Sequence, residues 1–405
     1  MPTLLVLAWD VGHNPLGRAH LLAQALARSY RVTLAGFQFP RYGNAVWKPL
    51  RDSDLRIASI PGSAFPSFQR TLEDLAHRVD PDVVIACKAR LPSVQAGLMI
   101  KAVRNRPLII DIDDYELAFF ENREPLVDPD ETDEKALKEP FEEAWTRYTE
   151  NLLTAADRLL VSNAELQRRF GGVVVPHARD ETAFRPNQFD RPSVLRRLGL
   201  KPDQKVILFA GTPRPHKGLL HVLDAVKRVR RRHDCRLVVV GTPPDRAFED
   251  ELRRRGGRAL SMIPDQPFQR LPEILTAADL VCAVQDPNSM VSEYQLPAKI
   301  VDAMAMEVPV IATDVPPLRN LIEAGAVEPV TLNNLAARIA SWLSASAQGR
   351  SPQVERARAL FQQQYSYRAI NRTLVGVVER CLSAPKPLPG PIVDFLGAQA
   401  RRYPS

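Results

Sequence analysis

The chain contains the stretch Phe209-Ala-Gly-Thr-Pro-Arg-Pro-His-Lys217-Gly218, which ends an apolar run and leads into an amphipathic helical pattern. A second stretch, Glu293-Tyr-Gln-Leu-Pro-Ala-Lys299-Ile-Val-Asp302-Ala-Met-Ala, follows several strand–helix units later. A turn with two fixed cations before a helix N-terminus suits a diphosphate, and a carboxylate at a second helix start suits hydroxyl groups attached to it. The two stretches together predict a site for a nucleotide sugar.

Short β-branched runs alternate with helical patterns along most of the chain. In the first half we expect strands at 4–9, 31–36, 83–87, 108–111, 159–162 and 173–176. In the second half we expect them at 206–210, 237–241, 259–263, 280–284 and 308–313. Alternation of this kind is typical of parallel sheets with right-handed crossover helices. The predicted fold class is α/β, with two doubly wound, Rossmann-like domains.

Two breaks in the pattern divide the chain. Its 405 residues exceed what one hydrophobic core usually serves. Apolar periodicity stops between residues 184 and 192, which predicts an N-terminal domain over 1–187 and a C-terminal domain over 188–387. A second, proline-rich break precedes a short helical pattern near the end. We expect this break to be extended and to return the tail, 388–405, to the N-terminal domain.

The composition argues against a secreted or membrane-spanning protein. The N-terminus has no basic leader and too short an apolar run for a signal peptide, and no later run has the length needed to span a bilayer. We therefore expect a cytoplasmic location. The four cysteines lie far apart without a CxxC pair, so reduced, packed thiols are expected rather than disulfides or zinc.

The net charge of +7 raises the question of a nucleic-acid partner. The densest basic cluster, 227–233, lies at the end of a predicted helix, where cations complement the helix dipole and solvate the outer face. No aromatic residues interleave with these arginines to stack on bases, so we expect no nucleic-acid partner. Attraction to an acidic acceptor or peripheral contact with an anionic inner membrane face remains open.

Several motifs resemble, in order and spacing, those of the group 1 (family 4) glycosyltransferases. They lie at 10–13, 156–163, 175–184, 217–218, 277–280 and 302–312. The resemblance covers most of the chain and implies a GT-B fold, in which two facing Rossmann-like domains enclose a cleft and the C-terminal one holds most of the donor. It also implies transfer of a sugar from a UDP- or GDP-sugar to a hydroxyl acceptor, with retention at the anomeric carbon.

Two cations are the catalytic candidates at the phosphate end of the donor site. Transfer leaves new negative charge on the β-phosphate, which Arg214 would clamp and Lys217 would face as a point charge. A cation at a helix start is disfavoured by the helix dipole, so an anionic ligand is favoured over an ordinary solvated lysine at Lys217. The family's usual turn resembles Gly-Arg-x-x-x-x-Lys-Gly; here Thr212 stands at the arginine position. Gly211 and Thr212 are expected to contact the donor.

The second stretch resembles the family's Glu-x7-Glu pair. Aligning Asp302-Ala-Met-Ala with the usual Glu-Ala-Met-Ala gives Asp302 the ribose role and leaves Glu293 nine residues upstream rather than eight. Glu293 is either a catalytic-site residue that contacts the transferred sugar or a solvent-exposed loop acid. Lys299 resembles a Pro-x-Lys variant that adds a third cation near the diphosphate. Backbone groups of a loop are expected to hold donor oxygens at Tyr294, Gln295, Leu296 and Pro297.

The N-terminal domain is expected to contribute Gly12 to the donor site, because a missing Cβ lets backbone approach phosphates. Asp113 and Asp114 end a strand at the sheet edge where ligands collect, which suggests recognition of acceptor hydroxyls or, as the lesser alternative, a metal. Because Arg214 and Lys217 would neutralise the diphosphate, we expect no metal and no other cofactor. Further candidates for the cleft are His13, His177 and Asp180.

Alternatives remain open from the sequence. The acceptor could be a glycan, a lipid-linked intermediate or a small molecule, and base recognition near 241–244 and 263–264 would use backbone groups. An epimerase or phosphorylase of the same fold would also bind a nucleotide sugar, and net charge alone supports a non-catalytic nucleotide- or nucleic-acid-binding protein. The sequence offers no paired carboxylates of the kind that a double-displacement hydrolase needs, which favours the transferase.

Overall fold

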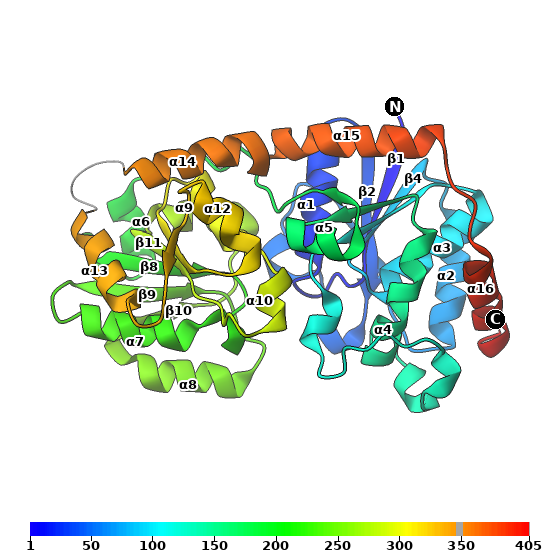
Figure 1. The fold of residues 1–405 in the computed structure, drawn as a ribbon, viewed down its shortest axis with the longest axis horizontal. Helices are drawn as coiled ribbons and strands as arrows, with labels where there is room; N and C mark the ends of the chain where they lie inside the picture. The colour runs from blue at the N-terminus through cyan, green and yellow to red at the C-terminus, as the bar shows by residue number, and fades with distance from the viewer. Residues whose placement is uncertain (346–350, 405) are drawn as a thin grey trace. The chain divides into compact units, whose positions relative to one another are not determined.

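The computed structural model describes residues 1–345 and 351–404, which form two units (Figure 1). Unit 1 comprises Met1–Pro176 and Ile370–Ser405, and unit 2 comprises His177–Ala369. The first boundary therefore lies before the predicted break at 187, because residues 177–184 pack within unit 2, where Phe184 is buried in the core. The second boundary lies inside α15 (Tyr367–Ser383) rather than at 387, because this helix runs through it without a break.

Unit 1 contains a seven-stranded parallel sheet with the order β3-β2-β1-β4-β5-β6-β7. The strands are β1 (Thr3–Ala8), β2 (Arg31–Gln38), β3 (Ile57–Pro61), β4 (Val83–Cys87), β5 (Leu108–Ile112), β6 (Arg158–Val161) and β7 (Val173–Val174). Every residue of β4 and β5 is buried, as expected for central strands covered on both faces. The sequence predicted all of these strands except β3, a half-exposed edge strand that ends in a proline.

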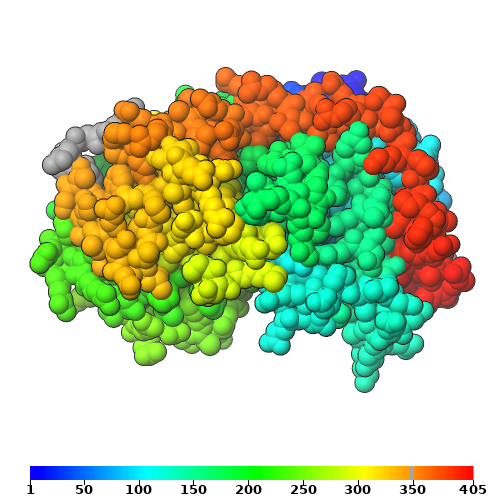
Figure 2. All heavy atoms as spheres, in the orientation of Figure 1, coloured from blue at the N-terminus to red at the C-terminus, as the bar shows by residue number. Residues whose placement is uncertain are grey.

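Helices pack around this sheet. They are α1 (Leu16–Leu26), α2 (Ser67–Arg78), α3 (Leu91–Arg104), α4 (Glu143–Leu152), α5 (Ala164–Phe170) and α16 (Gly390–Arg402). The tail lies on the surface of unit 1 (Figure 2), where the Tyr403 ring stacks on Phe65 with centroids 4.2 Å apart. The amide of Lys386 donates to Asp157 Oδ1 at 2.5 Å, so the proline-rich stretch before α16 is also tied to this unit.

The described part of unit 2 contains a six-stranded parallel sheet with the order β10-β9-β8-β11-β12-β13. The strands are β8 (Lys205–Ala210), β9 (Cys235–Val240), β10 (Leu260–Ile263), β11 (Leu280–Ala283), β12 (Val310–Thr313) and β13 (Glu328–Val330). The helices are α6 (Arg191–Arg197), α7 (Leu219–Val229), α8 (Arg246–Gly256), α9 (Leu271–Thr276), α10 (Met290–Tyr294), α11 (Ala298–Ala305), α12 (Arg319–Glu323), α13 (Leu335–Ala345) and α14 (Pro352–Leu360). The sequence predicted every strand except β13, which has three residues at the sheet edge.

Two apolar cores cover the two faces of the unit 2 sheet. Along β8, Ile207 and Phe209 pack with α7, α8 and α13, whereas Val206 and Leu208 pack with α9, α11 and α14. This alternation follows from the two-residue period of a strand, in which successive side chains point to opposite faces of the sheet.

The strand orders locate the crevice of each sheet. In both units the first strand in sequence lies inside the sheet, with its chain neighbour on one side and a later strand on the other: β1 beside β4, and β8 beside β11. Ligands of open α/β sheets bind outside the carboxyl ends of the strands at this point. The predicted Lys217 turn follows β8, and the second predicted stretch follows β11.

Among the described residues, no helix has both the length and the apolar character needed to cross a bilayer.

Candidate functional site

Glycines shape the turn between β8 and α7. Gly218 has φ +62°, and a Cβ on it would lie 2.1 Å from the carbonyl oxygen of Val284. Gly211 has φ +127°, and its amide donates to the carbonyl of Val240 at 3.0 Å. Backbone in this region of φ favours glycine, and the approach of Val284 excludes any side chain at Gly218. The turn after β8 therefore lies directly against the chain that leaves β11.

The predicted cations of this turn lie close together in the chain and in space. Lys217 Nζ donates to the carbonyl oxygen of Thr212 at 2.9 Å, so the lysine side chain folds back across the turn. Arg214 is half-buried and immediately precedes the short helix Pro215–Lys217. The structure thus brings the predicted residues Gly211, Thr212, Arg214 and Lys217 into one turn.

Lys299 is a buried lysine of unit 2. It lies in the first turn of α11, is 7% exposed, and its Nζ lies 4.1 Å from the centre of the Phe209 ring. Burial first, and the charge of Lys217 second, hold the pKa of Lys299 well below its usual value, while Asp302 opposes the shift. Within residues 1–345 and 351–404, no hydrogen bond or ion pair reaches its ammonium group. A buried cation of this kind fits a site for an anion.

Asp302 lies three residues after Lys299 on α11 and is 4% exposed. Its Oδ1 accepts a hydrogen bond from Nε of Arg179 at 2.5 Å. Burial raises the pKa of Asp302, and the charges of Arg179 and Lys299 oppose the increase. The sequence predicted Asp302 as a ribose ligand but did not predict its pairing with Arg179.

The region before α11 differs from the expected loop. Glu293 is exposed, and it lies in α10 rather than in a loop. Tyr294 ends this helix, and the amide of Gln295 donates to the carbonyl of Val291 at 2.9 Å. The amide of Gln295 is thus bonded within the chain and Pro297 has no amide, while contact of this loop with donor oxygens stays a prediction. Of the predicted loop over 294–297, only Tyr294 belongs to α10, and residues 295–297 form the loop.

Gln285 is a second residue that the sequence analysis missed. It follows β11, is 3% exposed, and neither polar atom of its side-chain amide has a hydrogen-bond partner among the described residues. Its backbone amide and carbonyl are both bonded to the hydroxyl of Thr313 at 2.9 Å, which fixes the chain at the end of β11. Gln285 directly follows Val284, whose backbone lies against Gly218 of the β8–α7 turn.

In unit 1, contacts within the unit account for the glycine in the turn after β1. The amide of Gly12 donates to Asp10 Oδ1 at 2.7 Å, and a Cβ on Gly12 would lie 2.8 Å from the carbonyl oxygen of Tyr42. Packing against Tyr42 therefore requires this glycine, and its amide is bonded to Asp10, while its approach to phosphates stays a prediction. His13 Nδ1 lies 2.6 Å from Asp10 Oδ1, and its ring stacks on Tyr42 at 4.0 Å. Burial lowers the pKa of His13, while Asp10 opposes the shift.

The two acids predicted for the acceptor surround a buried lysine. Lys88 Nζ lies 2.8 Å from Asp113 Oδ1, 2.8 Å from Asp114 Oδ2 and 3.3 Å from Glu116 Oε1. Burial raises the pKa of Asp113 to about 7, with Lys88 opposing. In the described chain, these three carboxylates are the group whose oxygens could together hold a metal ion, and the ammonium of Lys88 lies among them. Lys88 has a positive φ of 67° and belongs to no motif that the sequence analysis used.

The remaining predicted residues belong to unit 2. His177 begins the unit and is half-buried. Asp180 Oδ1 accepts hydrogen bonds from the amide and the hydroxyl of Thr182 at 2.8 and 2.7 Å. Asp180 therefore stabilises its own turn, a role that short acidic residues often have in loops.

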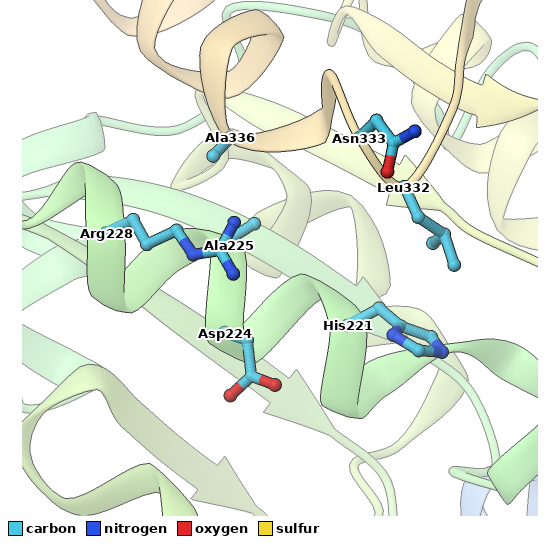
Figure 3. A pocket seen from close by; sticks show the side chains of 7 residues that line it. All are labelled: His221, Asp224, Ala225, Arg228, Leu332, Asn333 and Ala336. Carbon is cyan, nitrogen blue, oxygen red and sulfur yellow. The ribbon is translucent and has the colours of Figure 1, made fainter.

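A separate pocket of about 320 Å³ lies along the outer side of α7 (Figure 3). It is lined by His221, Asp224, Ala225, Arg228, Leu332, Asn333 and Ala336. Asp224 is paired with Arg255 at 2.5 Å, and none of the predicted site residues lines this pocket.

Comparison with known families identifies the part of the chain that contains Lys217 and Lys299. Residues 204–345 match the family of group 1 glycosyl transferases. The chain carries a group 1 glycosyltransferase domain. The matched segment begins before β8 and ends in α13, so it contains both stretches from which the nucleotide-sugar site was predicted. The family resemblance is confirmed over residues 204–345, which contain the motifs at 217–218, 277–280 and 302–312.

Curated relatives of this glycosyltransferase domain are sugar transferases. The chain is 29% identical over 194 residues to a D-inositol 3-phosphate glycosyltransferase of Nocardia farcinica, covering 43% of this chain and 41% of the relative. It is 32% identical over 161 residues to the lipopolysaccharide core biosynthesis mannosyltransferase LpsB of Rhizobium meliloti, covering 38% and 44%. The chain thus spans about two fifths of the length of the curated relatives it matches.

Solved structures extend the similarity beyond the glycosyltransferase domain. Anabaena Alr3699/HepE, in complex with UDP and glucose, superposes with a TM-score of 0.70 at 16% identity, covering 94% of this chain and 100% of that one. Sucrose-phosphate synthase of Thermosynechococcus elongatus gives a TM-score of 0.65 at 16% identity, covering 95% and 100%. With two parallel α/β units, the chain has the GT-B fold, which confirms the predicted fold class.

Proposed function

We propose that the protein is a hexosyltransferase-type glycosyltransferase, which moves a sugar from a nucleotide diphosphate sugar to a hydroxyl acceptor in glycan or glycoconjugate biosynthesis. The observation that carries this proposal is the buried ammonium of Lys299, which has no hydrogen-bond or ion-pair partner in the described chain and lies within the electrostatic influence of Lys217. Two neighbouring cations at helix starts are costly unless an anion binds between them.

A diphosphate satisfies this requirement. It would accept hydrogen bonds from both lysines and raise the depressed pKa of Lys299, so binding is coupled to protonation of this lysine. During transfer the β-phosphate gains negative charge, and preorganised cations that face it stabilise the transition state more than the ground state. Arg214, in the same turn, is the third donor to this group.

The reaction proceeds with retention at the anomeric carbon. The acceptor hydroxyl attacks the face that the nucleotide leaves, and its proton passes to the departing phosphate oxygen. No metal is required, because the lysines supply the positive charge at the diphosphate and Lys88 supplies it among the carboxylates of unit 1. Asp113 and Asp114 recognise hydroxyl groups of a glycan, lipid-linked or small-molecule acceptor.

The protein acts in the cytoplasm, with peripheral contact to the anionic inner membrane face. Lys227, Arg228, Arg231 and Arg232 are exposed at the C-terminal end of α7, and a cluster of this kind attracts anionic lipids. Sedimentation with phosphatidylserine vesicles tests this contact. Binding that persists after all four residues are replaced by glutamine would contradict it, as would preferential binding to an oligonucleotide.

Transfer itself is tested by incubating the full chain with UDP-, GDP- and ADP-sugars and analysing the products with and without candidate acceptors. A thermal shift with one nucleotide sugar selects the donor, because a ligand bound only by the folded state raises stability with its occupancy. We expect a new glycosidic product with one donor. A protein that binds no nucleoside diphosphate, or that interconverts the donor sugar without an acceptor, would refute the proposal.

A further inference from the structure

We propose that Arg179 is a positioning residue, which holds the carboxylate of Asp302 toward the ribose of the donor and makes nucleotide binding depend on the ribose hydroxyl groups. This inference rests on the proposed function and deepens it, because it assigns the nucleoside end of the same site.

The Arg179–Asp302 ion pair is one-sided. Arg179 contacts one carboxylate oxygen, Oδ1, through Nε at 2.5 Å, and its Nη1 donates to the carbonyl of Ala178 at 2.8 Å. In the described residues no hydrogen bond reaches Asp302 Oδ2. A two-oxygen clamp would use up the carboxylate, whereas contact at one oxygen leaves the other as an acceptor for a hydroxyl donor.

Arg179 itself is held by contacts on several sides. Its backbone amide donates to the carbonyl of Tyr365 at 3.0 Å, and its carbonyl accepts from the amide of Tyr367 at 2.9 Å. Its guanidinium lies 5.0 Å from the centre of the Phe268 ring. Phe268 follows β10 and the segment near 263–264 where base recognition was predicted. Arg179 therefore connects the carboxylate on α11 to the segment that follows β10.

Arg179 also affects the charge of Asp302. Burial raises the pKa of Asp302 and would favour the neutral carboxyl group, while Arg179 is the largest opposing influence. An ionised carboxylate accepts hydrogen bonds from vicinal hydroxyl groups, whereas a protonated one has lost part of this capacity. Without Arg179, a higher pH is needed to ionise Asp302. The arginine thus controls both the direction and the charge of the carboxylate.

The competing explanation is a pair that only stabilises the fold. The two explanations differ in one measurable respect: a positioning role affects ligands that carry ribose hydroxyls, and a purely structural role does not distinguish them. Inorganic pyrophosphate lacks ribose, and a 2′-deoxynucleoside diphosphate lacks one hydroxyl, so these probes separate the two ends of the site.

The experiment measures the dissociation constants of the full chain by isothermal titration calorimetry. The probes are the tightest binder among UDP, GDP and ADP, its 2′-deoxy analogue and pyrophosphate. The variants are Arg179→Met, Arg179→Lys and Asp302→Asn. The matched control is Arg191→Met, since Arg191 pairs with Asp279 at the same distance of 2.5 Å in the same unit.

We expect the wild type to prefer the ribonucleotide over its 2′-deoxy analogue. Arg179→Met and Asp302→Asn should each weaken ribonucleotide binding by about tenfold to a hundredfold and reduce that preference, in keeping with the strength of charged hydrogen bonds. Pyrophosphate binding should stay within about twofold, close to the error of such comparisons. Arg179→Lys should recover part of the affinity, and Arg191→Met should leave all three constants unchanged.

Several results would overturn the inference. A wild type that does not distinguish the two nucleotides contradicts it before any variant is made, so a variant that fails to fold does not leave the question open. Equal losses for ribonucleotide and pyrophosphate in Arg179→Met would assign the arginine to the fold alone. If neither pyrophosphate nor any nucleoside diphosphate binds the wild type, the proposed function fails instead.

Discussion

Replacing Lys299 by methionine separates the stability of unit 2 from its function. Methionine keeps the length of the side chain and its contact with Phe209 but removes the buried charge. Loss of a charged hydrogen bond to the diphosphate costs about 1.5–3 kcal/mol, which weakens nucleoside diphosphate binding by about tenfold to a hundredfold. The same change should stabilise the free protein, because it removes a charge that burial penalises.

The stability difference between the wild type and Lys299→Met should also change with pH. The folded pKa of Lys299 lies well below its unfolded value, so between these two values the unfolded state binds more protons than the folded state. The stability of the wild type therefore rises with pH across this window, and the advantage of the methionine variant shrinks as pH approaches the unfolded pKa of 10.5. Below the folded pKa the advantage is complete.

The assay is thermal denaturation of both proteins at several pH values, together with calorimetric titration of the nucleoside diphosphate. A gain of 1 kcal/mol corresponds to a rise of about 2–4 °C in Tm for a domain of about 200 residues. Lys201→Met is the control, because Lys201 is an exposed lysine of unit 2 paired with Asp234 at 2.8 Å, and it should change neither property much. A less stable Lys299→Met protein that binds nucleotide like the wild type would refute the reasoning.

Three further changes test other parts of the structure. Lys217→Ala should lower turnover by about a hundredfold to a thousandfold, which is the usual loss when a donor to developing negative charge is removed. Unchanged turnover would show that Lys217 does not act on the phosphate. Gly218→Ala should lower the urea midpoint by more than Gly257→Ala, because both glycines have positive φ but only Gly218 has backbone 2.1 Å from its missing Cβ; equal losses would contradict the contact with Val284. Lys88→Met should cost about 3–5 kcal/mol of unfolding free energy by leaving buried carboxylates without their cation, and the added change Asp113→Asn should restore part of it.

The strands of both sheets were predictable to the extent that they are buried. β4, β5 and β11 are uniformly buried, and each appears in the sequence as an apolar run, which in β5 is interrupted only by Asp111. β3 and β13 lie at sheet edges and contain Pro61 and Pro329, so their patterns resemble loops. Sequence periodicity therefore predicts the centre of each sheet better than its edges.

The candidate site was predictable where one segment supplies it. The β8–α7 turn contains its glycines and cations within eight residues, and Lys217 Nζ donates to the carbonyl oxygen of Thr212 in the same turn. Arg179 lies 123 residues from Asp302, and no spacing rule connects them. Lys88 likewise meets carboxylates that follow a different strand, β5. Partners brought together only by the tertiary fold leave no local pattern in the sequence.

The choice of partner for Asp302 decides whether the diphosphate site is charged. Lys299 and Asp302 are three residues apart on α11, a spacing at which opposite charges commonly pair on a helix surface. A Lys299–Asp302 pair would neutralise the ammonium and remove the reason for an anion to bind. Arg179 instead occupies the carboxylate, and Lys299 remains against Phe209 with its positive charge uncompensated by an ion pair. The Arg179–Asp302 pair therefore occupies the carboxylate at the ribose end of the site, and the charge of Lys299 is left for the diphosphate.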